Sequence, residues 1–182
     1  MNVIITKSAE ETKKVAKLFA KDIASEFQAE ENATREHGER SSRRMTATRE
    51  PGERSSRRMT ATIIALVGNL GAGKTTFTQG FAEGLNIKEK IQSPTFVILK
   101  EYKLHRHKIS KSCFKNFYHI DCYRLKNEKD AKTIGLEEIL KDPENLVLIE
   151  WAERVKKILP KKQLMTVKFF HINEKTRKIV FN

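Results

Sequence analysis

Residues 68–76 read Gly-Asn-Leu-Gly-Ala-Gly-Lys-Thr-Thr and match the pattern G-x-x-x-x-G-K-[ST]. Glycines let the backbone direct N–H groups toward phosphate oxygens, and a helix that starts at the lysine directs its positive end toward the same anion. Residues 62–67 form an apolar, β-branched run typical of a strand buried in a parallel sheet, and residues 74–85 have apolar side chains at helical spacing. This order predicts a phosphate-binding loop, with Lys74 reaching the β- and γ-phosphates and the Thr75 hydroxyl ligating Mg²⁺.

Two further apolar strands end in carboxylates. Residues 117–121 end in Asp121 and residues 146–150 end in Glu150, and each resembles the strand that carries the acid of a Walker B motif. In a phosphate-loop fold, ligands bind beyond the carboxyl ends of the strands, so both acids are expected to face the same nucleotide. Two such acids beside a phosphate loop favour metal coordination and water positioning.

The other periodic segments predict the elements around this centre. Ser8 to Glu11 is a capping box, and the apolar spacing that follows indicates a helix to about Phe27. Thr12, on the first turn, could approach a nucleotide, but a position on the helix surface is the preferred interpretation. The remaining expected elements are a strand at 3–5, helices at 134–140 and 152–159, and a hairpin of strands at 164–172 and 178–181.

The segment between the loop helix and the first acidic strand offers weaker signals. Residues 93–99 read as a turn into a strand, and Thr95 is a candidate switch residue that brings a hydroxyl to Mg²⁺, although a plain turn has the same sequence. Residues 100–115 carry six basic side chains and one acid, which indicates a solvated hairpin tip. His105 and His107 lack a third metal ligand.

An internal repeat interrupts the pattern before the phosphate-loop strand. Residues 33–46 recur as residues 47–60, and the copies differ only at His37 and Pro51. Arg, Ser, Thr, Glu and Gly dominate this segment, so it cannot bury enough apolar surface to offset the entropy of ordering. We interpret it as an exposed insertion of duplicated foreign material, and a basic RNA-binding arm is the alternative.

Size, charge and cysteine content narrow the class of protein. The 182 residues predict a single domain, 1–182, interrupted at about 33–60. Residues 33–62 supply +4 of the net charge of +13, and the rest is lysine spread along the chain, which favours a lysine-rich proteome over a nucleic-acid surface. The sequence has no apolar run of membrane-spanning length and no secretory signal, which predicts a cytoplasmic protein without membrane contact. Its two cysteines, Cys113 and Cys122, lie nine positions apart, as suits reduced thiols in a cytosolic protein.

Four motifs, in this order, resemble those of the TsaE family, also called YjeE. They are residues 68–76, Ser93-Pro94-Thr95-Phe96, His119-Ile120-Asp121-Cys122-Tyr123-Arg124-Leu125 and Ile149-Glu150-Trp151. The resemblance implies an α/β fold of the P-loop NTPase type, a three-layer sandwich with a mainly parallel central sheet and added antiparallel strands. It also implies a Mg²⁺-dependent ATPase that supports formation of threonylcarbamoyladenosine beside the anticodon of tRNA. The implied partner is the TsaB–TsaD transferase heterodimer, through which the protein would meet tRNA indirectly.

The same resemblance assigns roles to residues. The implied ATP-binding set is Gly71, Ala72, Gly73, Lys74, Thr75, Thr76 and Asp121. Thr75 and Glu150 would ligate Mg²⁺, and the catalytic set would be Lys74, Asp121 and Glu150. Thr95 corresponds to the switch segment and Trp151 to the tryptophan beside the active site. The chain departs from the family pattern in the repeat, in the lengthened basic hairpin near His105, and at Ala152, where a proline is frequent.

Two other functions remain open at this point. A small-molecule or nucleoside kinase shares the loop and the size, but no clear Arg-rich lid is present in the sequence. A GTPase is disfavoured because no N-K-x-D motif occurs; residues 127–130 have the wrong order. A non-catalytic, ATP-dependent binding module is also consistent with the motifs, and ATP turnover with and without partners would separate it from an ATPase.

Overall fold

The computed structural model describes residues 2–42, 60–92, 98–104, 114–125, 128–161 and 163–182. Its strands are β1 (Asn2–Thr6), β2 (Thr62–Val67), β3 (Leu99–Lys103), β4 (Asn116–Asp121), β5 (Asn145–Glu150), β6 (Leu164–His171) and β7 (Arg177–Phe181). They form one seven-stranded sheet in the order β1-β7-β6-β2-β5-β4-β3. The centre is parallel, with β2 between β5 and β6 and β4 beside β5, and antiparallel strands extend both edges. The predicted mainly parallel sheet with added antiparallel strands is confirmed.

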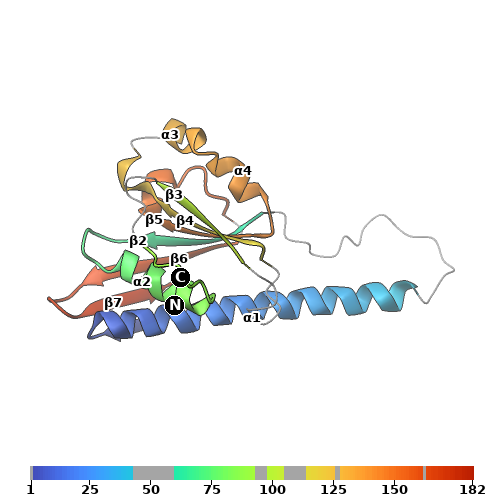
Figure 1. Cartoon of the computed structure of the whole chain (residues 1–182), viewed down its shortest axis with the longest axis horizontal. Coiled ribbons are helices and arrows are strands. Elements are labelled where there is room, and N and C mark those ends of the chain that lie inside the picture. Colours follow the sequence, from blue (N-terminus) through green and yellow to red (C-terminus); the bar gives the residue numbers. More distant parts are fainter. Residues whose placement is uncertain (1, 43–59, 93–97, 105–113, 126–127, 162) are drawn as a thin grey trace.

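Helices cover both faces of the sheet (Figure 1). One face packs against α1 (Ala9–Ser42) and α2 (Lys74–Gly84). The other packs against α3 (Glu128–Thr133), α4 (Leu136–Lys141) and the 3₁₀ helices η1 (Cys122–Arg124) and η2 (Ala152–Val155). The result is a three-layer sandwich. The first and last strands of the chain lie side by side, because Asn2 of β1 pairs with Phe181 of β7.

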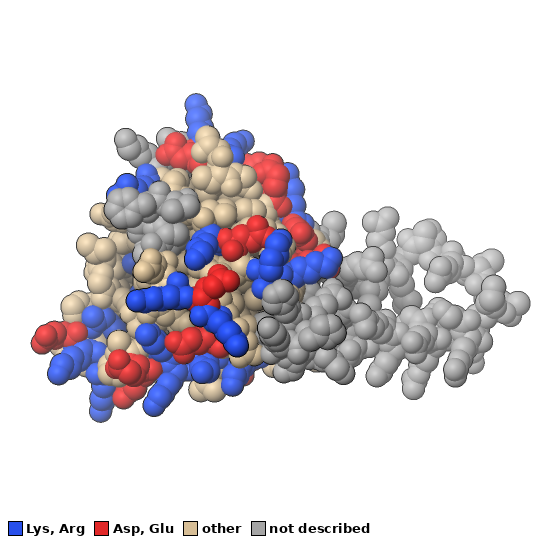
Figure 2. Space-filling view, viewed as in Figure 1, with Lys and Arg blue, Asp and Glu red and all other residues tan. Residues whose placement is uncertain are grey.

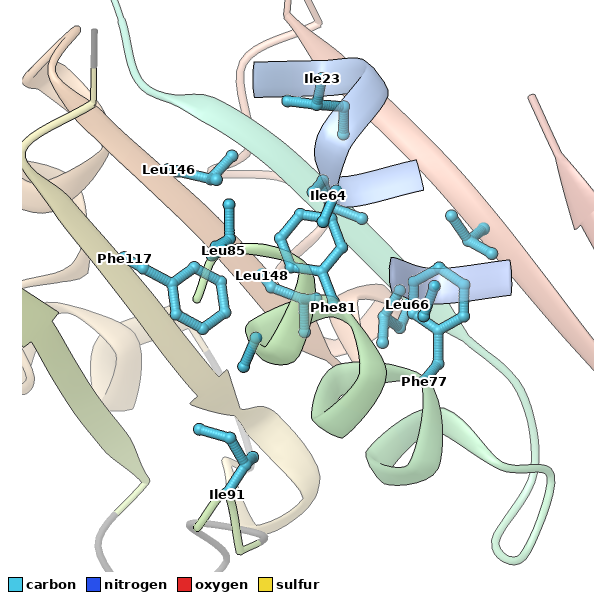
Figure 3. Packing of buried hydrophobic residues seen from close by; sticks show 14 of the residues in the cluster. Ile23, Ile64, Leu66, Phe77, Phe81, Leu85, Ile91, Phe117, Leu146 and Leu148 are labelled. Carbon is cyan, nitrogen blue, oxygen red and sulfur yellow. The ribbon is translucent and has the colours of Figure 1, made fainter. Parts of the chain in front are cut away.

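Alternation along β2 explains why its sequence is apolar throughout. Ile64 and Leu66 join the core under α1 and α2, while Ile63 and Ala65 join the core on the opposite face. Figure 3 shows the first of these cores, where Phe77 and Phe81 of α2 lie over the strands. The loop that follows β2 therefore starts from a strand held on both faces.

The helices α1 and α2 approach closely at Gly80. A Cβ atom at this position would lie 2.3 Å from the backbone oxygen of Lys13, and one at Gly84 would lie 2.6 Å from that of Lys17. Only glycine leaves room for this contact. The close approach fixes the helix that carries Lys74 against the helix that begins near the chain's start.

The first helix is longer than its apolar pattern predicts. Its end was expected near Phe27, but α1 continues to Ser42 and extends past the sheet, so the start of the repeat at residues 33–42 is helical (Figure 1). The composition argument against ordering of the repeat therefore does not hold for this part. Ala, Glu, Arg and Gln propagate a helix that is already nucleated, because each added residue gains one backbone hydrogen bond. The remainder of the repeat, at residues 43–59, lies outside the described residues.

Three smaller expectations also change. The helix expected at 152–159 is only the 3₁₀ helix η2, because Trp151 begins it with a φ of 58° and Pro160 restricts the residue before it. Residues 134–140 give α4 from Leu136, and α3 precedes it without having been predicted. Residues 99–103 of the expected strand and basic tip form β3, which pairs with β4, whereas residues 105–113 lie outside the described part of the chain.

Charges of both signs mix on the face shown in Figure 2, where Lys and Arg alternate with Asp and Glu. The ion pairs at the surface include Lys115–Glu144 and Lys132–Glu137. The described residues include no helix that is both long and apolar enough to cross a membrane. The one described cysteine, Cys122, is free and buried, and burial raises the pKa of its thiol to about 12.

Candidate nucleotide-binding site

The loop at residues 68–73 joins the carboxyl end of β2 to the first residue of α2. Gly71 and Gly73 have φ angles of 75° and 99°, in the left-handed region that favours glycine. The N–H of Ala72 donates to the carbonyl of Asn69 at 3.2 Å and closes the turn. The Ala72 side chain packs in the core, so this residue offers a ligand only its backbone.

Lys74 is held by the loop that it follows. Its Nζ donates to the carbonyls of Gly68 at 2.6 Å and Asn69 at 3.0 Å, and lies 3.8 Å from the centre of the Trp151 ring. Burial lowers the pKa of Lys74, while the nearby carboxylates, Glu150 foremost, oppose that shift. A partly desolvated ammonium group gains from an anionic ligand, because the ligand replaces lost hydration.

Glu150 is the most highly connected polar side chain of the site, and it is buried. Thr75 Oγ1 donates to Glu150 Oε2 at 2.9 Å, and Thr78 Oγ1 donates to Oε1 at 3.2 Å. The Nε2 of His119 lies 2.9 Å from the same Oε1. Glu150 also pairs in register with Asp121 on the neighbouring strand, so the two predicted acids lie side by side at the carboxyl ends of β5 and β4. Hydrogen bonds from three side chains fix the direction of this carboxylate.

His119 and Thr78 were not predicted as part of the site. His119 lies two residues before Asp121 on one face of β4, and Thr78 lies one helical turn after Thr75. The period of two in strands and of three to four in helices would have placed both beside the predicted acid and hydroxyl. Only the tertiary structure shows that both side chains bind the same carboxylate.

Asp121 combines a local structural role with a place in the site. Its Oδ1 accepts a hydrogen bond from the N–H of Tyr123 at 2.9 Å, which caps η1. The Tyr123 ring lies 5.1 Å, centre to centre, from Trp151, and the two rings form one wall of the site. Tyr123 belongs to the motif that begins at His119, yet no role was predicted for it.

A cavity of about 330 Å³ brings most of the predicted residues together. Its lining includes Gly71, Gly73, Lys74, Thr75, Thr76, Asp121, Glu150 and Trp151. Ala72 faces the core instead, and Thr95 lies outside the described residues. Thr12 is buried rather than on the helix surface, so that preference was wrong; its hydroxyl lies 2.8 Å from that of Thr6.

The family follows from comparison with known proteins. The family model described as "Threonylcarbamoyl adenosine biosynthesis protein TsaE" matches residues 6–179. The chain belongs to the TsaE family. This confirms the resemblance drawn from the four sequence motifs.

Curated relatives and a solved structure agree with TsaE membership. Proteins named "tRNA threonylcarbamoyladenosine biosynthesis protein TsaE" are similar over part of their length: that of Bacillus subtilis is 41% identical over 105 residues, 58% of this chain and 60% of the relative. That of Borreliella burgdorferi is 36% identical over 107 residues, 59% of this chain and 72% of the relative. The crystal structure of Bacillus subtilis YdiB superposes with a TM-score of 0.60 at 27% identity, covering 99% of this chain and 83% of that one. The sequence match thus spans 60% of the first relative's length, and the structural match confirms the P-loop NTPase fold for this TsaE chain.

Proposed function

We propose that this TsaE chain is a Mg²⁺-dependent, ATP-binding protein and ATPase that supports formation of threonylcarbamoyladenosine next to the anticodon in tRNA. It acts in the cytoplasm with a transferase complex of the TsaB–TsaD type, and meets tRNA through that complex. The observation that carries the proposal is the contact of Thr75 with Glu150 beside Lys74, at the start of the helix that follows the phosphate loop.

The loop and Lys74 fit a chain of phosphates. The residues from Gly71 to Thr76 present backbone at the start of α2, where N–H groups without helical partners favour an anion. Lys74 now donates to two loop carbonyls, and a triphosphate would offer this ammonium oxygens that carry full charge. Lys74 therefore binds the β- and γ-phosphates and neutralises part of their charge.

The oxygen pair of Thr75 and Glu150 fits Mg²⁺. Mg²⁺ prefers oxygen ligands, keeps several waters and completes its shell with substrate phosphates. When bound, Mg²⁺ would supply charge stabilisation on the phosphoryl oxygens.

The two acids, Glu150 and Asp121, have different roles. Glu150, whose carboxylate is fixed by Thr78 and His119, ligates Mg²⁺. Asp121 positions the attacking water and accepts its proton. The indole of Trp151 lies against Lys74 and limits access of bulk water to the phosphate end. Thr95, the proposed switch residue, would add a second hydroxyl toward the metal.

The test uses the chain's single tryptophan, Trp151, as its own reporter. Binding of ATP with Mg²⁺ should draw Lys74 from the indole and change the fluorescence, and EDTA should weaken binding. Phosphate release should be slow for the protein alone and faster with the TsaB–TsaD complex. Absence of ATP binding, or phosphate transfer to a nucleoside in place of water, would contradict the proposal, and the second result would establish the kinase alternative.

A further inference from the structure

Trp151 adopts a backbone conformation that a bulky side chain rarely takes. Its φ of 58° and ψ of 40° lie in the left-handed region, directly after Glu150 and at the start of η2. This conformation costs free energy, so neighbouring contacts must offset that cost. The resulting geometry places the indole against Lys74, with the ammonium 3.8 Å from the ring centre. The contacts that hold Trp151 in this position therefore also decide the surroundings of Lys74.

Arg154 makes several of these contacts. Its backbone N–H donates to the carbonyl of Trp151 at 3.1 Å, and its guanidinium carbon lies 6.0 Å from the centre of the indole. The same guanidinium carbon lies 5.6 Å from the centre of the Tyr123 ring. The Nη1 of Arg154 donates to the carbonyl of Leu125 at 3.0 Å. Arg154 thus joins η2 both to η1 and to the residue that follows η1.

We propose that Arg154 is a positioning residue of the nucleotide site, which holds the indole of Trp151 between Lys74 and Tyr123. The inference rests on the proposed function, because it takes Lys74 as a residue that binds phosphate. The described residues that line the cavity include Tyr123 and Trp151 but not Arg154, so its effect on a ligand passes through the rings. A guanidinium suits this role because its planar face can lie against a ring while its edge donates hydrogen bonds.

The indole gives Lys74 an apolar neighbour that excludes water on one side. A contact between opposite charges is stronger where such a wall lowers the local dielectric constant. Without the indole, water would take its place beside Lys74 in the free protein, so the ammonium would become no more available to phosphate. The contact with phosphate would meanwhile be exposed to water. Loss of Arg154 should therefore weaken ATP binding by loosening Trp151.

The first measurement needs no ligand. Arg154→Met keeps an unbranched side chain of similar length but removes its charge and its hydrogen-bond donors. The emission of Trp151 reports on its own surroundings, because the chain has a single tryptophan. In the free protein, the variant should shift this emission to longer wavelength and increase its quenching by acrylamide. Arg154→Lys should recover part of the change, because an ammonium can still donate to the carbonyl of Leu125.

The second measurement is a double-mutant cycle based on calorimetry of MgATP binding. Arg154→Met and Trp151→Ala should each weaken MgATP by about tenfold, the scale of one interaction with a charged group. The double variant should bind no more weakly than Trp151→Ala alone, because Arg154 acts through the indole. The melting temperature of Arg154→Met should change little, since Arg154 is exposed.

Lys156→Met is the matched control. It makes the same kind of change at an exposed position just after η2 that does not line the cavity, and it should alter neither the emission nor MgATP affinity. Parental emission and quenching in Arg154→Met would overturn the positioning role. An equal loss of MgATP affinity from Arg154→Met with and without the indole would also overturn it. A parent that binds no MgATP would overturn the proposed function and the role of Arg154 toward ATP, and the emission would still show whether Arg154 holds the indole.

Discussion

The two faces of the sheet are packed in different ways. Under α1 and α2 the core is built on phenylalanine rings, where Phe77 contacts Phe19, Phe81, Phe169 and Phe181 with ring centres 5.3 to 6.4 Å apart. Under α3, α4 and η2 the core is mainly aliphatic, and the covering helices have no more than six residues. The first face is held by one long helix pair and the second by several short elements.

The residues of the candidate site come from both faces of the sheet, so the two kinds of packing support different parts of it. The helix of Lys74 and Thr75 belongs to the phenylalanine face, so the half of the site proposed to bind phosphate is fixed by α1 and α2. Asp121 and Glu150 lead directly into η1 and η2, whose buried residues belong to the aliphatic face. Substitutions of core residues on the first face should therefore lower stability and nucleotide binding together, whereas substitutions of core residues on the second face should lower stability alone.

Gly80→Val should have the largest effect and tests the first half of this comparison. The added side chain would meet the backbone of Lys13 at 2.3 Å, where neither helix can yield easily. We expect a loss of about 3 kcal/mol or more in the free energy of unfolding, with loss of ATP binding. Thermal unfolding measures the loss of stability, and calorimetry measures ATP binding. Glu83→Val is the control, at an exposed position of the same helix. Apart from a small cost in helix propensity, it should change the free energy of unfolding by about 0.5 kcal/mol or less.

Leu136→Ala is the matching change on the aliphatic face. Leu136 is fully buried at the start of α4, and its truncation should cost about 2 to 4 kcal/mol. ATP affinity of the folded fraction should stay close to parental, because Leu136 does not line the cavity that contains Lys74 and Glu150. A parallel loss of ATP affinity would remove the proposed division of the site.

Lys74→Ala should affect binding without a loss of stability. The variant removes charge-assisted contacts to phosphate and should weaken ATP about a hundredfold, corresponding to about 3 kcal/mol. It also removes a buried cation whose pKa is lowered by desolvation, so the melting temperature of the free protein should not fall. Calorimetry and thermal unfolding provide the two measurements, and ATP affinity within a factor of three of the parent would contradict the role of Lys74.

Glu150→Gln should separate binding from hydrolysis. The amide retains the size of the carboxylate but loses its charge toward Mg²⁺, so ATP binding should weaken less than phosphate release in the presence of partners. We expect hydrolysis to fall by at least about tenfold, since one charged contact in the transition state is lost. Hydrolysis at the parental rate would exclude the metal role proposed for Glu150.

Deletion of residues 47–60, one copy of the repeat, should have the smallest effect. Among the described side chains, Phe27 is the last of α1 that packs against the core. Halving or doubling a flexible connection changes closure entropy by only about 0.6 kcal/mol. The melting temperature and ATP binding should be nearly unchanged, and any RNA binding should become less salt-dependent because four Arg and two Glu are removed. A large fall in melting temperature would show that the repeat packs on the domain.

The strand, loop and helix around Lys74 were predicted because each signal is local. The apolar run of β2, the glycines and the start of α2 are consecutive, and their backbone conformations follow from residue type and spacing. Asp121 and Glu150 were placed at one edge of the sheet because parallel strands end on the same side. The length of α1 was missed because helix propagation beyond the core leaves no apolar stripe.

The sequence by itself thus determined the phosphate loop, the two acids and the class of fold, since short-range backbone geometry and the direction of parallel strands specify them. Only the tertiary structure decided that His119 and Thr78 both bind Glu150, that Arg177 fixes a distant hairpin to Gly71, and that Gly80 admits the backbone of Lys13. These contacts join residues whose separation in sequence carries no periodic signal. They arise when strand order and helix packing bring the side chains within hydrogen-bond or van der Waals distance.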